Sequence, residues 1–371
     1  MYVRRNRCSA VMVKRDSENQ LGKRVDQDFR MAVRAQKRRE RICFLGLAVA
    51  FFIAFFASFM IGRYPVDPPT LCKILLSSFL PLDQTWTQNA SIVVWTIRLP
   101  RILAGILVGG CLSTAGLAFQ SLFKNPMASP DILGASSGAG FGAALAILWG
   151  LGSGAVSASA FVFGLVAVGV AYLCSIRANH NPILGLILAG IMISSLFNAG
   201  ISLIKLVADV DNTLPAITFW LMGSLSGKGM GDVAMGAIPM GIGLAVLLFM
   251  NPKLPLLSLG DDEAQSLGVN TKLSRLVIVI AATLVTSASV AIAGIVGWVG
   301  LVIPHFTRLL MGESKRYLMP GSLVMGATFL VVVDDIARAA TTIDMPLGIL
   351  TAFVGAPFFM YLIMRKGNAS W

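Results

Sequence analysis

The sequence is poor in the residue types that build catalytic and metal centres. Only 13% of its 371 residues are charged, and its two histidines are His180 and His305. Two such distant histidines are too few for a metal centre in a membrane, and His305 follows Pro304, where we expect it to end a helix. The five cysteines form no C-x-x-C pair, which is typical of small packing residues. We therefore expect no metal site.

The sequence also lacks a nucleotide-binding loop. Residues 223–228 read Gly-Ser-Leu-Ser-Gly-Lys, but Gly229 follows where such a loop has Ser or Thr, and the glycine spacing is wrong. We expect no catalytic residue and no cofactor in this chain. If the protein pumps, ATP and magnesium belong to a partner subunit.

Acidic residues are missing from the interiors of the long apolar runs and lie at their ends or between them. Carriers coupled to protons or sodium ions place ionisable groups at membrane depth. This absence disfavours a self-powered secondary transporter of a small solute, which we keep as the alternative function.

Apolar length is what the sequence has in abundance, with 56% hydrophobic residues and a mean hydropathy of +0.77. Because a bilayer core takes about 20 apolar residues per helix, these runs predict a polytopic membrane protein. Single spans are expected at residues 42–62, 102–123, 178–204, 233–252, 317–333 and 345–364. Residues 132–176 read as two spans separated by the glycine-rich stretch 150–154, and residues 276–307 are ambiguous between one span and two.

Charge near the termini resolves this ambiguity. Thirteen Lys and Arg precede residue 42, and Arg365 and Lys366 follow the last run. Positive charge favours the cytoplasmic side, so both termini are expected there and the number of spans must be even. Residues 276–307 then hold a full helix and a short one, broken near Pro304, and the total is ten. Residues 1–41 are expected to be a flexible, basic cytoplasmic tail, with Met12 or Met31 as alternative starts, and not a nucleic-acid-binding segment.

The polar loop at residues 253–275 is expected to carry a short amphipathic helix. Ser258 or Asp261 can cap its start and Gly268 can end it. Leu259, Ala264 and Leu267 would then leave an apolar edge exposed. Such an edge suits docking to a soluble partner, and the alternative is a helix that lies on lipid headgroups.

Several motifs, in this order, carry a resemblance to a known family. They are Arg98-Leu-Pro-Arg101, Leu107-Val-Gly-Gly110, Gln120, Lys124-Asn-Pro-Met-Ala-Ser-Pro130, Leu188-Ala-Gly190, Trp220-Leu-Met-Gly-Ser-Leu225, Leu259-Gly-Asp-Asp262, Gly300-Leu-Val-Ile-Pro-His305, Asp334 with Ala337-Arg338, and Gly355-Ala-Pro-Phe-Phe359. From about residue 42 to residue 365 the chain resembles the FecCD family of ABC importer permeases.

The resemblance implies an all-α subunit of about ten transmembrane helices with the type II ABC importer permease fold, over residues 42–366, followed by a short tail at 367–371. It implies a permease in the cell inner membrane that imports iron–siderophore, haem or cobalamin by alternating access, with molybdate also open. Expected partners are two copies of an ATP-binding subunit, a periplasmic or lipoprotein substrate-binding protein, membrane lipid, and a second permease subunit. That second subunit is either another copy of this chain, giving a homodimer, or a paralogue.

The resemblance also assigns residues to three sites. Arg98, Arg101 and Arg338 would meet acidic residues of the binding protein near the outer face, and the alternative is that they are snorkelling anchors. The loop at 253–275 corresponds to the coupling helices, with candidate ATPase contacts at Gly260, Asp261, Asp262, Ala264, Leu267 and Gly268. A cytoplasmic gate is implied at Asn125, Met127, Asn179, His180, Asn181 and Pro182, which can also be ordinary turn residues.

Overall fold

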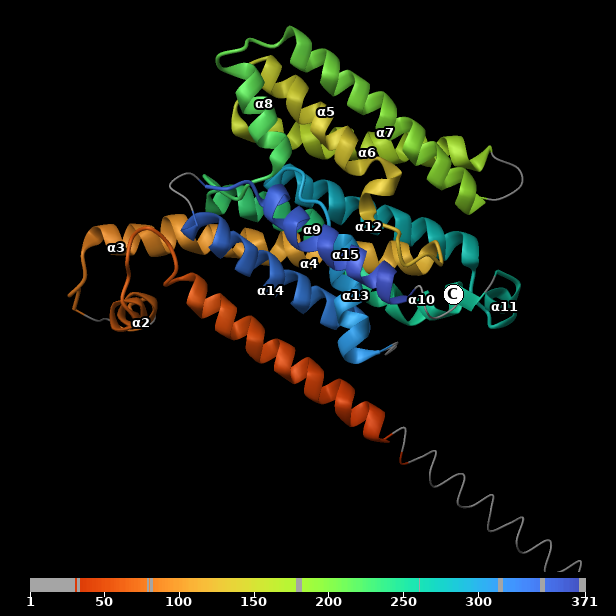
Figure 1. The fold of residues 1–371 in the computed structure, drawn as a ribbon, viewed down its shortest axis with the longest axis horizontal. Helices are drawn as coiled ribbons and strands as arrows, with labels where there is room; N and C mark the ends of the chain where they lie inside the picture. Colours follow the sequence, from red (N-terminus) through yellow and green to blue (C-terminus); the bar gives the residue numbers. More distant parts are fainter. Residues whose placement is uncertain are drawn as a thin grey trace, which may run out of the picture.

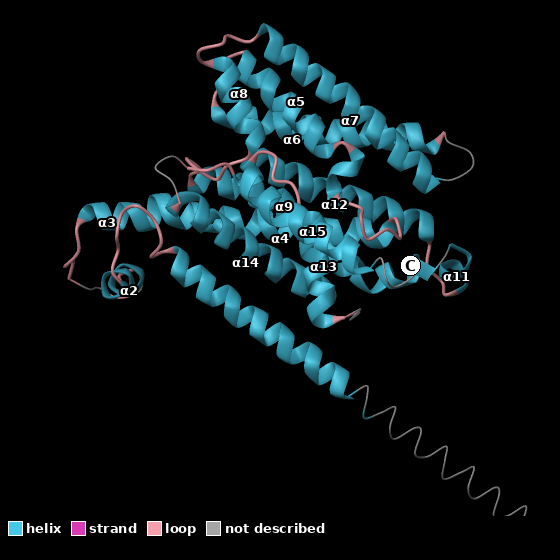
Figure 2. Cartoon of the chain, viewed as in Figure 1, coloured by secondary structure: helices cyan, strands magenta, loops and turns pink. Residues whose placement is uncertain are grey.

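A computed structural model describes residues 31, 34–78, 80, 83–177, 182–259, 261–312, 316–340 and 344–366. Across these described ranges every regular element is a helix, and Figure 2 shows them joined by loops of varied length. The all-α fold expected from the apolar runs is confirmed.

Seven helices of the described chain are long and apolar enough to cross a bilayer. They are Arg34–Ser58, the continuous segment Gln88–Leu122 that contains α3, a π-helical turn and α4 (Leu99–Leu122), α6 (Ser153–Ile176), α7 (Pro182–Val207), α9 (Met230–Met250) with its extension, α12 (Thr271–Ala293) and α14 (Leu318–Ala339). Three of the four shorter apolar helices pack among these long ones, namely α5 (Ala135–Leu148), α13 (Val299–Met311) and α15 (Leu347–Lys366). Seven and three give the predicted ten.

The bundle has two distinguishable ends (Figure 1). The short helices α2 (Pro68–Leu76) and α3 (Gln88–Ile92) lie at one end, and α10 (Leu254–Leu259) and α11 (Asp261–Ser266) lie at the other. Another short helix, α8 (Thr213–Met222), packs beside α5 and α15 without crossing the bundle. We refer below to the α2–α3 end and the α10–α11 end.

Helix α4 forms the centre of the bundle and packs against α9, α12, α13 and α14. Glycines allow these close approaches. A Cβ on Gly109 would lie 2.2 Å from the carbonyl oxygen of Gly326 in α14, and a Cβ on Gly116 would lie 1.8 Å from that of Gly300 in α13. In Figure 1, α5–α8 lie on one side of this core, and α14 and the helix Arg34–Ser58 lie on the other. The backbone contacts explain why small residues recur along α4.

The predicted break in the run 132–176 is confirmed. Helix α5 ends at Leu148 and α6 begins at Ser153. Gly150 takes a left-handed φ of 67° in the turn, where a side chain would be strained.

The predicted break near Pro304 is wrong, because the chain breaks earlier, at residues 294–298. Gly294 has a φ of 68°, and a Cβ there would lie 2.4 Å from the carbonyl oxygen of Trp220. Pro304 lies inside α13, where its missing N–H frees the carbonyl of Gly300. The side-chain amide of Gln120 donates to this carbonyl at 3.4 Å and to that of Leu301 at 3.2 Å. The amide of Gln120 thus replaces the donor that Pro304 lacks, and α13 continues through the proline.

Two helices extend further than their apolar runs. The first begins at Arg34, within the basic segment. Helix α14 continues past Val333 to Ala339 and so includes Asp334, Asp335 and Arg338. The expectation that acids stay outside the apolar helices is therefore wrong for α14, and the next section shows what accommodates them.

Candidate functional site

Arg101 of α4 holds two carboxylates at the α2–α3 end. Its Nε donates to both oxygens of Asp334, at 2.8 and 3.0 Å, and its Nη2 donates to Oδ1 of the same residue at 2.9 Å. Its Nη1 donates to Asp344, in the loop before α15, at 2.7 Å. Arg101 is only 8% exposed. This arrangement of charge-assisted bonds joins α4, α14 and the loop.

Arg98 and Arg338 complete the network and are also buried. Arg98 donates to the backbone carbonyls of Phe59 and, at 2.6 Å, Tyr64. Arg338 donates to the carbonyl of Ser58 at 2.8 Å and pairs with Asp335 on its own helix. These bonds fix the end of the first helix against α4 and α14.

The three arginines are therefore not the exposed charges that the sequence led us to expect. The expectation that they lie on an open rim or snorkel into water is wrong, because all three are buried and donate to the chain's own carboxylates and carbonyls. The three do lie together at one end of the bundle, as the motif positions implied.

A pocket of about 540 Å³ opens beside this network and is rich in cations. Arg98, Arg101 and Arg338 form part of its wall, while Arg63 and Lys228 come from flanking loops. Arg63 is the accessible member, with 54% of its side chain exposed, and it pairs with Asp344 at 3.1 Å. Sequence reasoning missed Arg63 and Lys228, although Lys228 ends the segment that was rejected as a nucleotide loop.

Two groups outside the spans have shifted pKa values in this region. Burial lowers the pKa of Lys228, and nearby Asp232 partly offsets this. Burial alone would raise the pKa of Asp344, but hydrogen bonds from Arg101 and Ser226 and the charges of Arg101 and Arg63 lower it below its ordinary value. Asp344 is therefore held as a carboxylate at neutral pH.

The loop 253–275 forms two short helices, α10 and α11, at the opposite end. Gly268 ends α11 as predicted, with a φ of 81°, and its N–H donates to the carbonyl of Gln265 at 2.9 Å. Ser258 does not cap α11, because it lies within α10 and its hydroxyl donates to the carbonyl of Leu254 at 3.1 Å. Asp261 is the first residue of α11 and not the residue before it, so neither proposed residue holds the capping position.

The expected apolar edge on this loop is present, with one correction. Leu259 and Leu267 are each 60% exposed, and Asp262 is exposed beside them. Ala264 is fully buried, so the expectation that it shares the edge is wrong. Gly260 lies outside the described residues.

Asn125 acts as a turn residue at the same end. Its side-chain oxygen accepts from the backbone N–H of Met127 at 2.9 Å, and its own N–H donates to the carbonyl of Gln120 at 3.1 Å. Met127 is partly exposed beside it. Asn179, His180 and Asn181 lie outside the described residues, and Pro182 begins α7.

His305 does not end a helix, contrary to expectation, because α13 continues to Met311. Its Nδ1 lies 3.3 Å from the carbonyl oxygen of Leu301, and its ring meets that of Phe359 edge-on. His305 therefore lies inside α13 and contributes to the packing of this helix against α15.

Helices α7 and α15 each leave a face uncovered in the single chain. Leu206 of α7 and Phe353 of α15 are 81% and 73% exposed. Ser195, Asn198 and Ser202 add a polar stripe to α7, spaced at three and four residues and exposed. Both serine hydroxyls donate to carbonyls of their own helix. The carboxamide of Asn198 thus stands out as a polar group on an exposed transmembrane face.

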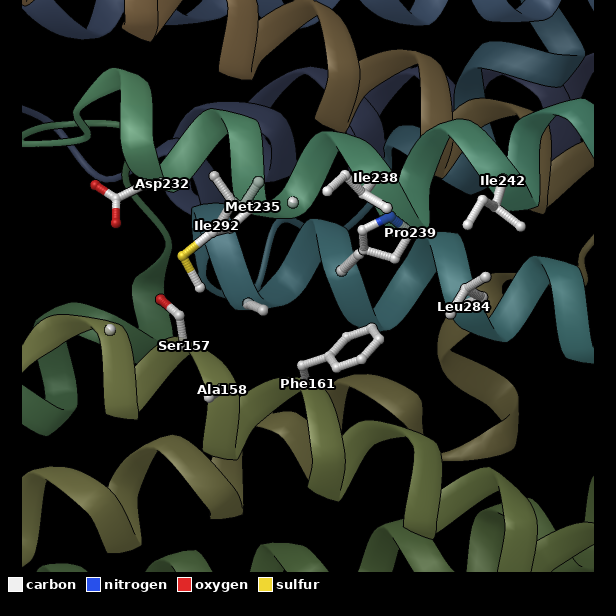
Figure 3. Close-up of a pocket in the computed structure, with 14 residues that line it drawn as sticks. Ser157, Ala158, Phe161, Asp232, Met235, Ile238, Pro239, Ile242, Leu284 and Ile292 are labelled. Carbon is white, nitrogen blue, oxygen red and sulfur yellow. The ribbon is translucent and has the colours of Figure 1, made fainter.

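A separate pocket between α6, α9 and α12 has a different character (Figure 3). It has a volume of about 400 Å³, and Phe161, Ile238, Pro239 and Leu284 are among its mostly apolar lining. Its one charged group is Asp232 at its edge. A carboxylate at the edge of an apolar pocket disfavours anionic solutes, so this pocket is not a candidate path for anionic chelates or oxyanions.

The family model for the FecCD transport family matches residues 50–365. The chain belongs to this family. It is 36% identical over 320 residues to the molybdate import system permease protein MolB of Haemophilus influenzae, covering 86% of this chain and 94% of that protein. It is 39% identical to the cobalamin import system permease protein BtuC of Halobacterium salinarum, covering 77% of each chain. It is 35% identical to the hemin transport system permease protein HmuU of Yersinia pestis, covering 78% of this chain and 88% of the other.

A solved structure supports the same assignment. An inward-facing putative metal-chelate type ABC transporter superposes with a TM-score of 0.77 at 35% identity, covering 87% of this chain and 98% of that one. The chain therefore has an ABC importer permease fold and is a multi-pass membrane transport subunit.

Proposed function

We propose that this chain is the permease of an ATP-driven importer in the cell inner membrane, with both termini cytoplasmic. Two copies of a partner ATPase bind at the α10–α11 end and a substrate-binding protein delivers cargo at the α2–α3 end. The observation that carries the proposal is the exposure of Leu259, the last residue of α10, and of Leu267, which directly follows α11. The two short helices lie at one end of the bundle (Figure 1). Apolar side chains on a short helix at a membrane protein's aqueous end suit a soluble partner.

The alternating-access pathway is proposed to lie along the uncovered face of α7. A polar side chain such as Asn198 is costly against lipid, so it faces water or protein. A second copy of the chain that covers α7 and α15 would enclose such a path and bury Leu206 and Phe353. We therefore propose a homodimer.

The binding protein is proposed to dock over the cationic pocket at the α2–α3 end. Its acidic residues would meet Arg63, whose side chain is 54% exposed, and Lys228, from the loop before α9, while Arg98, Arg101 and Arg338 keep the pocket's wall in place. Rim charges of this type govern encounter and orientation. This assigns the three motif arginines a supporting role.

An iron–siderophore or a related metal chelate, such as haem or cobalamin, is the proposed cargo. The polar stripe on α7 is uncharged, which suits a large, hydrogen-bonding solute more than a small ion that needs a charged cage. MolB, which shares 36% identity, is a molybdate permease, so an oxyanion is the alternative cargo. The secondary-transporter alternative gains nothing from Asp334 and Asp335, because both are bonded to arginines.

Reconstitution tests the proposal directly. The chain is co-purified in lipid with its candidate ATPase and binding protein, and ATP hydrolysis is measured with empty and with loaded binding protein. Stimulation by the loaded protein supports the importer and allows a ligand screen with iron–siderophores, haem, cobalamin and molybdate. A chain that binds no ATPase contradicts the proposal.

A further inference from the structure

A basic pocket lies where the charged start of the first helix passes the start of α14. It has a volume of about 540 Å³, and its described lining consists of Lys37, Arg38, Glu40, Arg41, Arg316 and Tyr317. Four of these six residues are basic and one is acidic. The function proposed above uses none of them.

The three basic residues of the first helix line the same pocket. Arg41 follows Arg38 by three residues and Lys37 by four, so it shares a face of the helix Arg34–Ser58 with each of them. Arg316 approaches from the other wall and lies 5.5 Å from the ring centroid of Tyr317. Glu40 is buried and accepts a hydrogen bond from Gln36 at 3.1 Å. The pocket therefore combines two segments far apart in sequence and has a net positive charge.

An exposed apolar stripe continues from this pocket along the same helix. Ile42, Leu45, Val49 and Phe52 follow Arg38 at spacings of four, three, four and three residues, and each is 57–58% exposed. Phe44, three residues after Arg41, meets Tyr317 with ring centroids 5.5 Å apart, and aromatic rings of this kind favour the membrane interface. A cationic site that leads into an apolar stripe matches an anionic head with a hydrocarbon tail.

We propose that this pocket binds the phosphate headgroup of one anionic phospholipid, whose acyl chains lie along the exposed stripe of the first helix. Arginine guanidinium groups bind phosphate oxygens in a bidentate manner. Basic residues at a membrane surface each favour anionic lipid by about fivefold in affinity. The apolar stripe favours a lipid over free phosphate, since phosphate has nothing to contact there.

Native mass spectrometry of the delipidated, full-length chain in detergent tests the site. The chain is titrated with dioleoyl phosphatidylglycerol, dioleoyl phosphatidylcholine and inorganic phosphate, and binding of the first molecule is compared. We expect the phosphatidylglycerol to bind about tenfold or more tightly than the phosphatidylcholine, with no competition from phosphate. Equal affinity for the two lipids, or displacement of the phosphatidylglycerol by millimolar phosphate, overturns the proposal.

Charge-matched variants separate a built site from general attraction. The pair Arg38→Gln with Arg316→Gln removes two pocket cations and is expected to weaken the first phosphatidylglycerol by about tenfold or more. The control pair Arg34→Gln with Arg39→Gln removes the same charge from helix positions outside the pocket lining and is expected to weaken binding of the first phosphatidylglycerol clearly less than the pocket pair does, because these charges act on the headgroup only from a distance. Equal losses in both pairs overturn the proposal. The pair Arg38→Lys with Arg316→Lys keeps the charge and should retain the lipid preference, which controls for a folding defect.

Discussion

Arg101 is the residue on which the charge network depends most, because two carboxylates share its guanidinium. Replacing it by alanine leaves Asp334 buried without its bidentate partner. Breaking a buried pair in this way costs about 3–5 kcal/mol. We expect Arg101→Ala to lower the thermal unfolding midpoint of the detergent-solubilised chain strongly.

Arg63 provides the matched control, since it pairs with Asp344 in the same network but is 54% exposed. An exposed pair contributes about 0–1 kcal/mol, so Arg63→Ala should barely move the midpoint. Similar midpoints for the two variants would show that the network contributes little to stability and that Arg101 has another role.

Asp344 should make stability depend on pH in a defined direction. Its pKa lies below its ordinary value of 3.8, because bonds and charges from Arg101, Ser226 and Arg63 outweigh its burial. A depressed pKa adds stability that is present above the ordinary value and is lost as the pH falls through the folded value. The difference in unfolding midpoint between the wild type and Asp344→Asn should therefore be full at pH 7 and shrink below about pH 4. A difference that grows on acidification contradicts this assignment.

At the residue scale, the sequence identified which arginines matter but not how they are used. Motif positions brought Arg98, Arg101 and Arg338 together correctly. Their burial follows from the extension of α14 beyond its apolar run, which places Asp334 and Asp335 beside them. No local pattern predicts the pair of Arg101 with Asp334, because the two residues are 233 positions apart in the chain.

At the scale of an element, the break before α13 depends on one glycine. Gly294→Ala forces a side chain into a backbone conformation, φ 68° and ψ −164°, that is essentially restricted to glycine and costs about 1–3 kcal/mol. It also places a Cβ 2.4 Å from the carbonyl oxygen of Trp220. Gly297→Ala is the control in the same connection, since a Cβ there meets nothing within 4 Å. We expect the first variant to lower the unfolding midpoint and the second to leave it unchanged, and equal effects would contradict this account of the break.

The pair α10 and α11 should bind the ATPase through its exposed leucines. Leu259→Ser with Leu267→Ser removes two side chains that burial in an interface would each stabilise by about 1.5–3 kcal/mol. We expect ATPase affinity to fall tenfold or more in a pull-down titration. The control Leu45→Ser removes an equally exposed leucine from the lipid-facing helix Arg34–Ser58 and should leave the affinity unchanged. If both changes act alike, the coupling surface lies elsewhere.

The helices themselves were largely predictable from the length of the apolar runs, and their ends were less so. Pro304 indicated a break that Gln120 removes by bonding to the freed carbonyl of Gly300. The polar residues after Val333 indicated that α14 ends there, but buried ion pairs stabilise the helix as far as Ala339. In both cases a contact from a distant helix overrides the local signal.

At the scale of the whole molecule, the single chain exposes two kinds of transmembrane surface. The face of α9 around Ile238 is apolar, whereas the face of α7 carries Ser195, Asn198 and Ser202. Sequence hydropathy predicted both helices equally well, because it does not distinguish lipid from a partner or a water-filled path. The residues that each helix leaves exposed in the folded chain make that distinction, because they are polar on α7 and apolar on α9.

Cysteine accessibility can test this difference between the two faces. In a chain whose five native cysteines are replaced, Asn198→Cys should react with a membrane-impermeant maleimide in reconstituted vesicles, because a path for hydrophilic cargo must contain water. Ile238→Cys is the matched control, since Ile238 is 67% exposed in the single chain but lies on an apolar surface that lipid covers. If Asn198→Cys is labelled and the label is lost when the ATPase and nucleotide switch the path, the α7 face lines an alternating-access route. If neither cysteine reacts in any state, α7 faces lipid or a dry interface and the path lies along another helix.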